Sequence, residues 1–361
     1  MSHALQILAG KQARSVIAEK GLNADLFKLL VGASGGPKWF VLAGLDRYFC
    51  GEFFQRRQTP LYTLGSSAGA WRFSCYAQEQ PLEAINRLID GYSHLTYAKN
   101  STIHQVTQKS EELLGDVLGA NGANEIVSNP LIKTNTIVAK SLGLTRYEPK
   151  PLQLIGLMAS ALGNQIHRKH LGKYYQRVIF STDTSYVPFD YKDGIASAVV
   201  NYTQNNIKDA LLATGAIPLV VNGVKHIAGA GPGMYRDGGI IDYHFDQAFL
   251  PQTSPTQTDD NDLVLYPHFY NEFKPGWFDK FVKHRFANPE HFDNVVVLAP
   301  TAEFVARLPY GKIPDRKDFT ELSDHQRISY WQQVISESER LADEFQQSCE
   351  NANVIDKIKP I

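Results

Sequence analysis

Two short stretches of this sequence place a serine between glycines in the pattern G-x-S-x-G. They are residues 32–36 and 65–69, with Ser34 and Ser67 at the central position. A serine hydroxyl is a weak nucleophile near neutral pH, so it has to be exposed, aimed and paired with a base. The glycines permit a sharp strand-to-helix turn that sets the serine at a helix N-terminus, where backbone N–H groups are free. The pattern therefore indicates nucleophilic acyl-transfer chemistry.

The sequence around the two turns favours Ser67 as the nucleophile. If Ser34 attacked, the chain before it would have to supply a second oxyanion donor, and no glycine-rich loop lies upstream of it. The reverse arrangement works, because Gly35 and Gly36 could present their N–H groups to an oxyanion at Ser67 on a neighbouring parallel strand. The N–H of Ala68 would be a further donor, and each such donor contributes ~2.7–4 kcal/mol in the transition state.

A carboxylate within a glycine-dense run is the first candidate for the base. Asp237 is followed by Gly238 and Gly239, and glycines recur over residues 229–233. Such a backbone can follow an unusual path that points the carboxylate into a site. Other carboxylates lie in turn-like surroundings, and histidines after Asp237 could complete a Ser–Asp–His order. These alternatives, which stay open, are Asp193, Asp242, His244, His268 and His284.

The elements that would position these groups alternate between strand and helix in the first third of the chain. Strands are predicted at 27–31 and 61–64, each followed by a tight turn and a helix, at 37–53 and 68–76. This order indicates a parallel α/β architecture. Further predicted elements are helices at 12–20, 109–118, 152–162 and 206–214, strands at 132–139, 177–180, 263–266 and 295–298, a surface loop at 253–261, and a C-terminal amphipathic helix behind a cap at Ser323.

The chain shows no linker that would divide it into two halves. We therefore expect a single domain over residues 1–361. It would contain a central insertion at about 95–175 and a C-terminal helical region at about 301–350.

The composition restricts the classes of function. The formal net charge of -1 over 361 residues argues against nucleic acid, whose phosphates call for a basic face. The three cysteines have no metal-type spacing and favour a reducing compartment. The N-terminus lacks the apolar run of a secretory signal, and the most apolar stretch, 152–162, is far below the ~20 residues that span a bilayer. We expect a soluble, cytoplasmic protein without metal or cofactor, and the sequence does not indicate its oligomeric state.

Taken together, these residues resemble the patatin-like phospholipase family. Its glycine loop, its G-x-S-x-G elbow and its late D-G-[GA] motif occur here in the family's order. Residues 213–218 are also similar to the family's Ala-Ser/Thr-x-Ala-Ile-Pro segment, and the whole resemblance spans about 27–243. One departure is Trp39, which stands where the family's loop usually has a glycine and predicts a reshaped acyl entrance. The matching residues are Gly35, Gly36 and Lys38 in the loop, Gly65, Ser67 and Gly69 in the elbow, and Asp237, Gly238 and Gly239 in the last motif.

The resemblance implies a three-layer α/β/α fold with a largely parallel central sheet and a Ser–Asp dyad without histidine. Asp237 would take the proton from Ser67, which attacks an ester carbonyl, and the N–H groups of Gly35, Gly36 and Ala68 would hold the oxyanion. The implied substrate is a lipid or small ester, of a class that the sequence does not specify. The alternatives are an esterase with a Ser–His–Asp triad and an acyl-binding protein without turnover.

Residues 273–286 mix aromatic and basic side chains. Two interpretations are open: an interfacial segment that makes peripheral contact with lipid head groups, or an amphipathic helix that docks its aromatics on the core.

Overall fold

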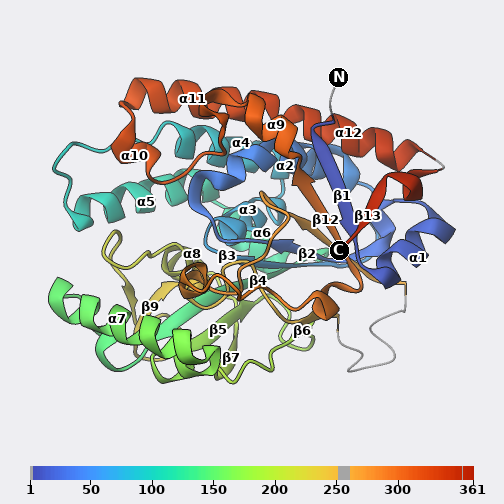
Figure 1. The fold of residues 1–361 in the computed structure, drawn as a ribbon. Helices are drawn as coiled ribbons and strands as arrows, with labels where there is room; N and C mark the ends of the chain where they lie inside the picture. The colour runs from blue at the N-terminus through green and yellow to red at the C-terminus, as the bar shows by residue number, and fades with distance from the viewer. Residues whose placement is uncertain (1–2, 251–260, 352) are drawn as a thin grey trace.

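The central feature of the computed structural model is an 11-stranded sheet with the order β13-β1-β12-β11-β2-β3-β4-β5-β7, in which β9 also pairs with β4 and β8 (Figure 1). The structure describes residues 3–250, 261–351 and 353–361. The strands of this sheet are β1 (Leu5–Ala9), β2 (Phe27–Gly32), β3 (Leu61–Ser66), β4 (Ile132–Ser141), β5 (Tyr175–Ser181), β7 (Ser197–Asn201), β8 (Val224–Lys225), β9 (Met234–Asp237), β11 (Leu263–Pro267), β12 (Val295–Pro300) and β13 (Ile358–Pro360). A separate pair joins β6 (Phe189–Asp190) to β10 (Ala248–Phe249).

The middle of the sheet is parallel. β12, β11, β2, β3 and β4 run in the same direction, whereas β1 pairs antiparallel with β12, and β5 and β9 pair antiparallel with β4. Every residue of β3, β11 and β12 is buried. Continuous apolar runs of this kind are typical of parallel strands that are covered on both faces. The predicted α/β class with a largely parallel sheet is confirmed.

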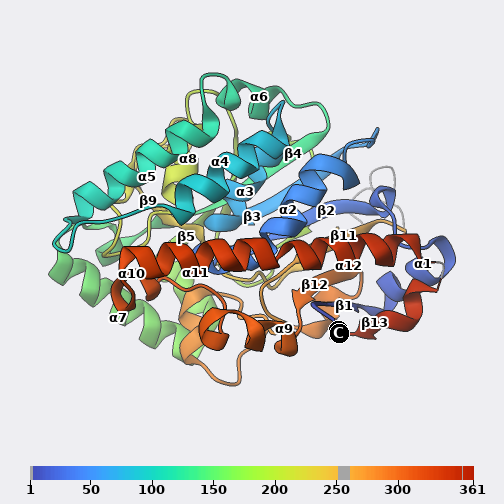
Figure 2. The same cartoon turned by 90° about the horizontal axis from the view of Figure 1, so that it is seen from above.

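Most of the helices gather on one side of the sheet, and α7 lies on the other (Figures 1 and 2). In Figure 2 the C-terminal α11 and α12 run across the first side as one long rod. The helices are α1 (Lys11–Lys20), α2 (Ala43–Tyr48), α3 (Ala68–Tyr76), α4 (Pro81–Ser93), α5 (Ile103–Leu118), α6 (Gly122–Ser128), α7 (Lys150–Ile166), α8 (Ile207–Thr214), α9 (Ala302–Arg307), α10 (Asp318–Glu321), α11 (Asp324–Glu337) and α12 (Glu339–Glu350).

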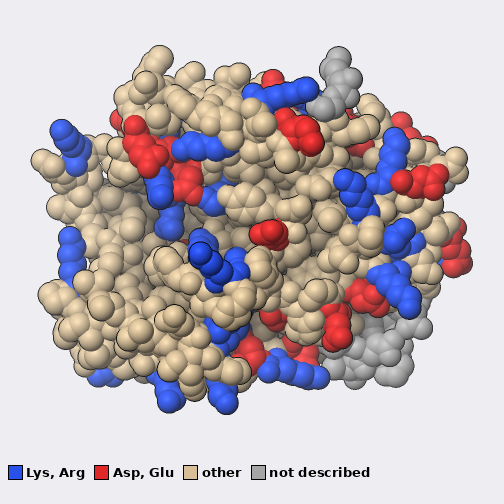
Figure 3. All heavy atoms as spheres, in the orientation of Figure 1, with Lys and Arg blue, Asp and Glu red and all other residues tan. Residues whose placement is uncertain are grey.

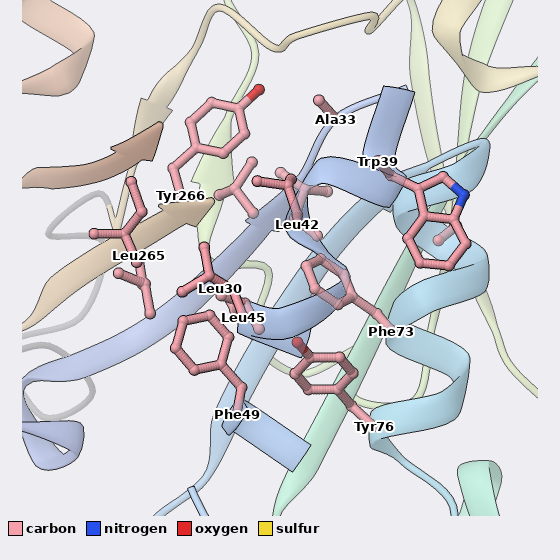
Figure 4. Close-up of a cluster of buried hydrophobic side chains, with 14 of the residues drawn as sticks. Leu30, Ala33, Trp39, Leu42, Leu45, Phe49, Phe73, Tyr76, Leu265 and Tyr266 are labelled. Atoms are coloured by element: carbon pink, nitrogen blue, oxygen red, sulfur yellow. The ribbon is translucent and has the colours of Figure 1, made fainter. Parts of the chain in front are cut away.

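The larger core lies between the sheet and the helices of the first side (Figure 4). Leu30 of β2 and Leu265 of β11 meet Leu45 of α2 and Phe73 of α3, and all of these side chains are fully buried. Burying a side chain of this size is worth roughly 1.5–3 kcal/mol. This core therefore fixes the strands and helices from which the glycine turns project.

A smaller core lies on the opposite face of the sheet. Ala139 of β4 and Tyr175 of β5 pack there with Leu157 of α7, Ile241 and Phe278. The second layer thus consists of α7 and short 3-10 helices, including Gly238–Ile240 and Trp277–Phe281. No helix in the described ranges is long and apolar enough to cross a membrane.

Several predicted elements differ in detail from the structure. The helix predicted at 37–53 is a 3-10 helix (Gly36–Leu42), then α2, then a π-helical turn (Phe49–Phe53). The strand predicted within the 95–175 insertion is β4, which lies between β3 and β5 in the main sheet. Ser323 caps α11 as predicted, in a capping box with Gln326. The loop predicted at 253–261 lies almost entirely outside the described residues.

Candidate active site

Ser67 and Asp237 meet because two strands end head to head along one edge of β4. β3 runs parallel to β4 and pairs with its first half, as far as Ser66 opposite Ile137. β9 runs antiparallel to β4 and pairs with its second half, with Asp237 opposite Val138. β5 occupies the other edge of β4. The ends of β3 and β9 therefore converge, and the residues that follow them face each other.

The backbone of Ser67 has a conformation that few non-glycine residues adopt. Its φ is 52° and its ψ is -123°, at the sharp turn between β3 and α3. Such a conformation costs of order 1–3 kcal/mol and persists only where the surroundings impose it. The Ser67 N–H donates to Thr214 Oγ1 at 2.9 Å, and that hydroxyl donates to the Ile137 carbonyl at 2.5 Å. A Cβ at Gly69 would collide with the Gly32 carbonyl, so the elbow also requires that glycine.

Asp237 is buried and contacts the serine directly. Ser67 Oγ donates to Asp237 Oδ2 at 2.9 Å, and the Gly239 N–H donates to Asp237 Oδ1 at 2.7 Å. Burial raises the pKa of Asp237 to about 6, against the opposing effect of the hydrogen bonds from Gly239 and Ser67. A carboxylate with a pKa in this range is largely ionised at neutral pH and can still accept a proton. A Cβ at Gly238 would collide with the Ile137 carbonyl, which explains the glycine beside the carboxylate.

The glycine loop after β2 lines the same small cavity as the serine and the aspartate, a space of ≈ 40 Å³. Gly36 has a φ of 58°, in the left-handed region that favours glycine. Within the described part of the chain, the N–H groups of Gly35, Gly36 and Ala68 donate to no acceptor. Free donors around a nucleophile are the arrangement that an oxyanion needs.

The histidines weighed as bases do not line this cavity. His268 is fully buried, and its Nδ1 lies 2.6 Å from the Tyr270 carbonyl. Burial lowers the pKa of His268 to about 3 and that of His244 well below its ordinary value. His284 is exposed. The geometry thus pairs Ser67 with a carboxylate and not with an imidazole.

The competing carboxylates have arginine partners. Arg177 donates to Asp242 Oδ2 at 2.6 Å and to Asp193 Oδ2 at 2.6 Å, and Arg168 lies 3.5 Å from each of them. Burial would raise the pKa of Asp193, but the charge and hydrogen bond of Arg177, the charge of Arg168 and the Ile195 N–H together outweigh it and lower the pKa. The ion pairs of these two carboxylates stabilise the second layer, and neither carboxylate forms a hydrogen bond with Ser67.

A larger groove of ≈ 880 Å³ opens beside the small cavity. Figure 3 shows the surface hollowed between the regions of α5 and α7. Gly35, Ile217 and Trp277 line both spaces, so the groove is continuous with the cavity that holds the serine. Its apolar wall includes Trp71, Tyr92, Leu95, Val106, Leu113, Ile217, Val220 and Phe319. Trp39, expected to reshape the acyl entrance, is instead buried in the core against Phe40 and does not line the groove.

Positive side chains gather where the two spaces join. Arg316 lines both, while Lys38 and Lys280 line the groove. Lys38 forms an ion pair with Asp315, and Lys280 Nζ lies 3.5 Å from the centre of the Tyr243 ring. Burial and repulsion from Arg316 lower the pKa of Lys38 to about 8, and burial with repulsion from Lys38 lowers that of Lys280 to about 7. Lys38 was predicted from the sequence motif and Lys280 belongs to the aromatic and basic segment at 273–286, whereas Arg316 has no local sequence signal.

The aromatic and basic segment at 273–286 contributes to the site through one residue pair, Trp277 and Lys280. It forms a short 3-10 helix and not the amphipathic helix of one interpretation. Phe273 and Phe278 are buried, whereas Phe281 is 71% exposed. Most of its aromatics therefore pack on the core.

No protein-family model matches this chain, and no curated protein matches it. Among solved structures, VipD from Legionella pneumophila is similar to it with a TM-score of 0.33 and 13% sequence identity. The match covers 74% of this chain and 54% of that chain, so this chain spans about half the length of VipD. A likeness at this level supports no conclusion about function.

Proposed function

We propose that this chain is a serine acyl hydrolase of the patatin-like type that cleaves lipid or related carboxylic esters. The main support is the hydrogen bond of 2.9 Å from Ser67 Oγ to Asp237 Oδ2, formed by a serine in a strained turn and a carboxylate without an arginine or lysine in contact among the described residues. A structural serine or a structural aspartate requires neither feature.

In the first half-reaction, Asp237 accepts the proton of Ser67 as Oγ attacks the ester carbonyl carbon. The carbonyl oxygen becomes an oxyanion next to the N–H groups of Gly35, Gly36 and Ala68. Collapse of this intermediate breaks the bond to the alcohol, which takes the proton from Asp237 as it leaves. The acyl group is then joined to Ser67 as an ester.

In the second half-reaction, water attacks the acyl-enzyme. Asp237 accepts a proton from this water, the oxyanion forms in the same place, and Ser67 leaves with the proton returned to Oγ. The acid is released and the dyad is restored. General base assistance of this kind contributes typically ~10²–10⁴-fold to the rate.

The spaces around the dyad favour an ester with an apolar chain and a negative group. The groove of ≈ 880 Å³ has an apolar wall that could hold an acyl chain. Arg316, Lys38 and Lys280 mark its junction with the serine cavity, and Asp315 forms an ion pair with Lys38. An anionic group next to the scissile ester would balance the remaining positive charge.

The decisive experiment is covalent labelling with a fluorophosphonate probe. We expect the wild type to be labelled on the peptide that contains Ser67, and the Ser67→Ala variant to remain unlabelled. A correctly folded wild type that neither reacts nor hydrolyses p-nitrophenyl butyrate would be an acyl-binding protein without turnover. A comparison of a monoacylglycerol with its phosphate, at equal chain length, tests the substrate class. We expect the wild type to prefer the phosphate and the Arg316→Gln variant to lose this preference.

A further inference from the structure

Helix α7 is amphipathic in the reverse sense of an ordinary surface helix. The face that it turns to the protein is mainly small and polar: Gln153, Gly156, Leu157, Ser160 and Asn164 are the buried residues. Gln153 accepts a hydrogen bond from the Leu219 N–H at 2.9 Å, and Asn164 donates to Asp279 at 2.7 Å. Hydrogen bonds and close backbone packing therefore attach this helix to the domain.

The opposite face of α7 carries the large apolar side chains and leaves them in solvent. Leu154 is 49% exposed, Ile155 52%, Met158 58%, Leu162 62% and Ile166 76%. They recur at helical spacing, so they form one continuous stripe. A soluble protein rarely leaves so large an apolar stripe uncovered unless it marks an interaction site.

The exposed charges at the two ends of the stripe are basic, and Glu148, which lies between two of them, forms an ion pair with Arg236. Exposed Arg146 and Lys150 lie at its N-terminal end, and exposed Lys169 and Lys173 follow its C-terminal end. Residues 149–182 contain no aspartate or glutamate. In Figure 3 the surface over α7, at the lower left, is mostly tan with lysine and arginine at its edges.

Helix α7 packs on two segments that contribute lining residues to the groove. The Leu219 backbone that Gln153 holds is followed by Val220, which is 43% exposed and lines the groove. On the other side, α7 packs against the 3-10 helix that contains Trp277, a groove residue, and exposed Phe281. The helix that carries the stripe is therefore a direct neighbour of two segments that line the groove.

We propose that the exposed face of α7 docks on an anionic lipid bilayer. An apolar face of this kind lies in the boundary between head groups and acyl chains, and cations beside it attract acidic lipids. A second copy of this chain fits less well, because any pairing of two such faces would bring Arg146, Lys150, Lys169 and Lys173 against one another. The proposal is independent of the chemistry at Ser67.

The test is co-sedimentation of the full chain with vesicles of phosphatidylcholine alone and of an equimolar mixture with phosphatidylglycerol. Using Ser67→Ala as the background keeps any ester hydrolysis from altering the lipid. We expect binding to the mixed vesicles that weakens with salt and falls more than about tenfold in Met158→Gln/Leu162→Gln, because each lost apolar side chain removes a substantial part of the buried area. Lys169→Gln/Lys173→Gln should reduce binding to the mixed vesicles and leave binding to the phosphatidylcholine vesicles unchanged.

Leu82→Gln is the matched control, since Leu82 on α4 is 40% exposed and lies on another helix. It should bind vesicles as the parent does. When Ser67 is intact, the Met158→Gln/Leu162→Gln variant should hydrolyse soluble p-nitrophenyl butyrate at the wild-type rate. Absence of vesicle binding by the parent, or equal binding by the α7 variant, would overturn the proposal. Light scattering that shows a dimer, dissociated by Met158→Gln/Leu162→Gln, would instead assign the face to a second copy.

Discussion

The two G-x-S-x-G turns lie side by side and use the same pattern in different ways. They follow adjacent parallel strands, with Gly32 of β2 opposite Gly65 of β3. Ser67 is held in a strained conformation, and its hydroxyl contacts Asp237. Ser34 is 5% exposed, its N–H donates to the Tyr243 carbonyl at 2.9 Å, and its side chain lies where a Cβ at Gly239 would be.

The difference shows that the function of such a turn depends on what lies beyond the strand end. β3 meets β9 along one edge of β4, so Ser67 finds a carboxylate at the end of the antiparallel strand. β2 lies between β3 and β11, and Ser34 lines the same cavity but, in the described part of the chain, forms no hydrogen bond with a carboxylate. The first turn thus contributes free N–H groups, and the second contributes the proposed nucleophile.

Exchanging each serine for alanine should separate the two turns most strongly. We expect Ser67→Ala to lower kcat for p-nitrophenyl butyrate by about 10³-fold or more, because it removes the group that forms the acyl-enzyme. Ser34→Ala, the matched control, should change kcat less than about tenfold. Comparable losses in both variants would mean that the turns do not have different roles.

Replacing Asp237 tests the hydrogen bond that Ser67 forms and Ser34 does not. Asp237→Asn should lower kcat by ~10²–10⁴-fold. The wild type should lose activity as the pH falls through about 6, since Asp237 acts as a base only when it is ionised. A pH profile of kcat/KM checks this limb, and an unchanged limb in Ser34→Ala would sharpen the assignment. Strong residual activity in Asp237→Asn, abolished by His268→Ala, would favour the triad instead.

The ionised Asp237 side chain should lower the free energy of unfolding of the chain. Its folded pKa of about 6 lies above the ordinary value of 3.8, so the folded chain holds the proton more tightly than the unfolded chain. The stability associated with the protonated form is present below pH 3.8 and is lost as the pH rises to about 6. We therefore expect Asp237→Asn to melt at a higher temperature than the wild type above about pH 6, with a smaller difference near pH 4. Thermal unfolding at both pH values would measure the gap.

Gly36→Ala should damage the first turn with a smaller effect on kcat. Gly36 has a φ of 58°, and a Cβ there would lie 3.2 Å from Arg316 Cγ. A displaced donor loop should lower kcat by about 10–10²-fold, less than the ~10²–10³-fold that complete removal of one oxyanion donor costs. Gly143→Ala is the matched control, because Gly143 has a φ of 55° and no atom near its Cβ. Both variants should lose some stability, but only the first should lose activity.

Thr214→Val gives the smallest expected change. It leaves the Ser67 N–H without its acceptor and should relax the strained turn, lowering kcat about tenfold with little change in KM. Thr214→Ser keeps the hydroxyl and should restore kcat. If neither variant differs from the wild type, the backbone of Ser67 is held by other contacts.

Sequence patterns predicted those features of the structure that depend on a few neighbouring residues. The glycines around Ser67 and Asp237, the apolar runs of β2 and β3, and the Ser323 cap can each be predicted from a few neighbouring residues. β1 and β9 gave no comparable signal, because polar residues interrupt their apolar runs and each depends on its pairing partner. β4 was predicted as a strand, yet its place in the middle of the sheet depends on β3 and β5, which lie far away in the sequence.

The sequence by itself determined the residue types and turns of the candidate site, because the ability of glycine to adopt tight turns is a local property. Only the tertiary structure decided which of the candidate bases lies beside Ser67, because that depends on how β3, β4 and β9 pair. It also decided where Arg316 and Lys280 stand, and that α7 turns its apolar side chains outward. Periodicity identifies the two faces of a helix, but only packing determines which one is buried.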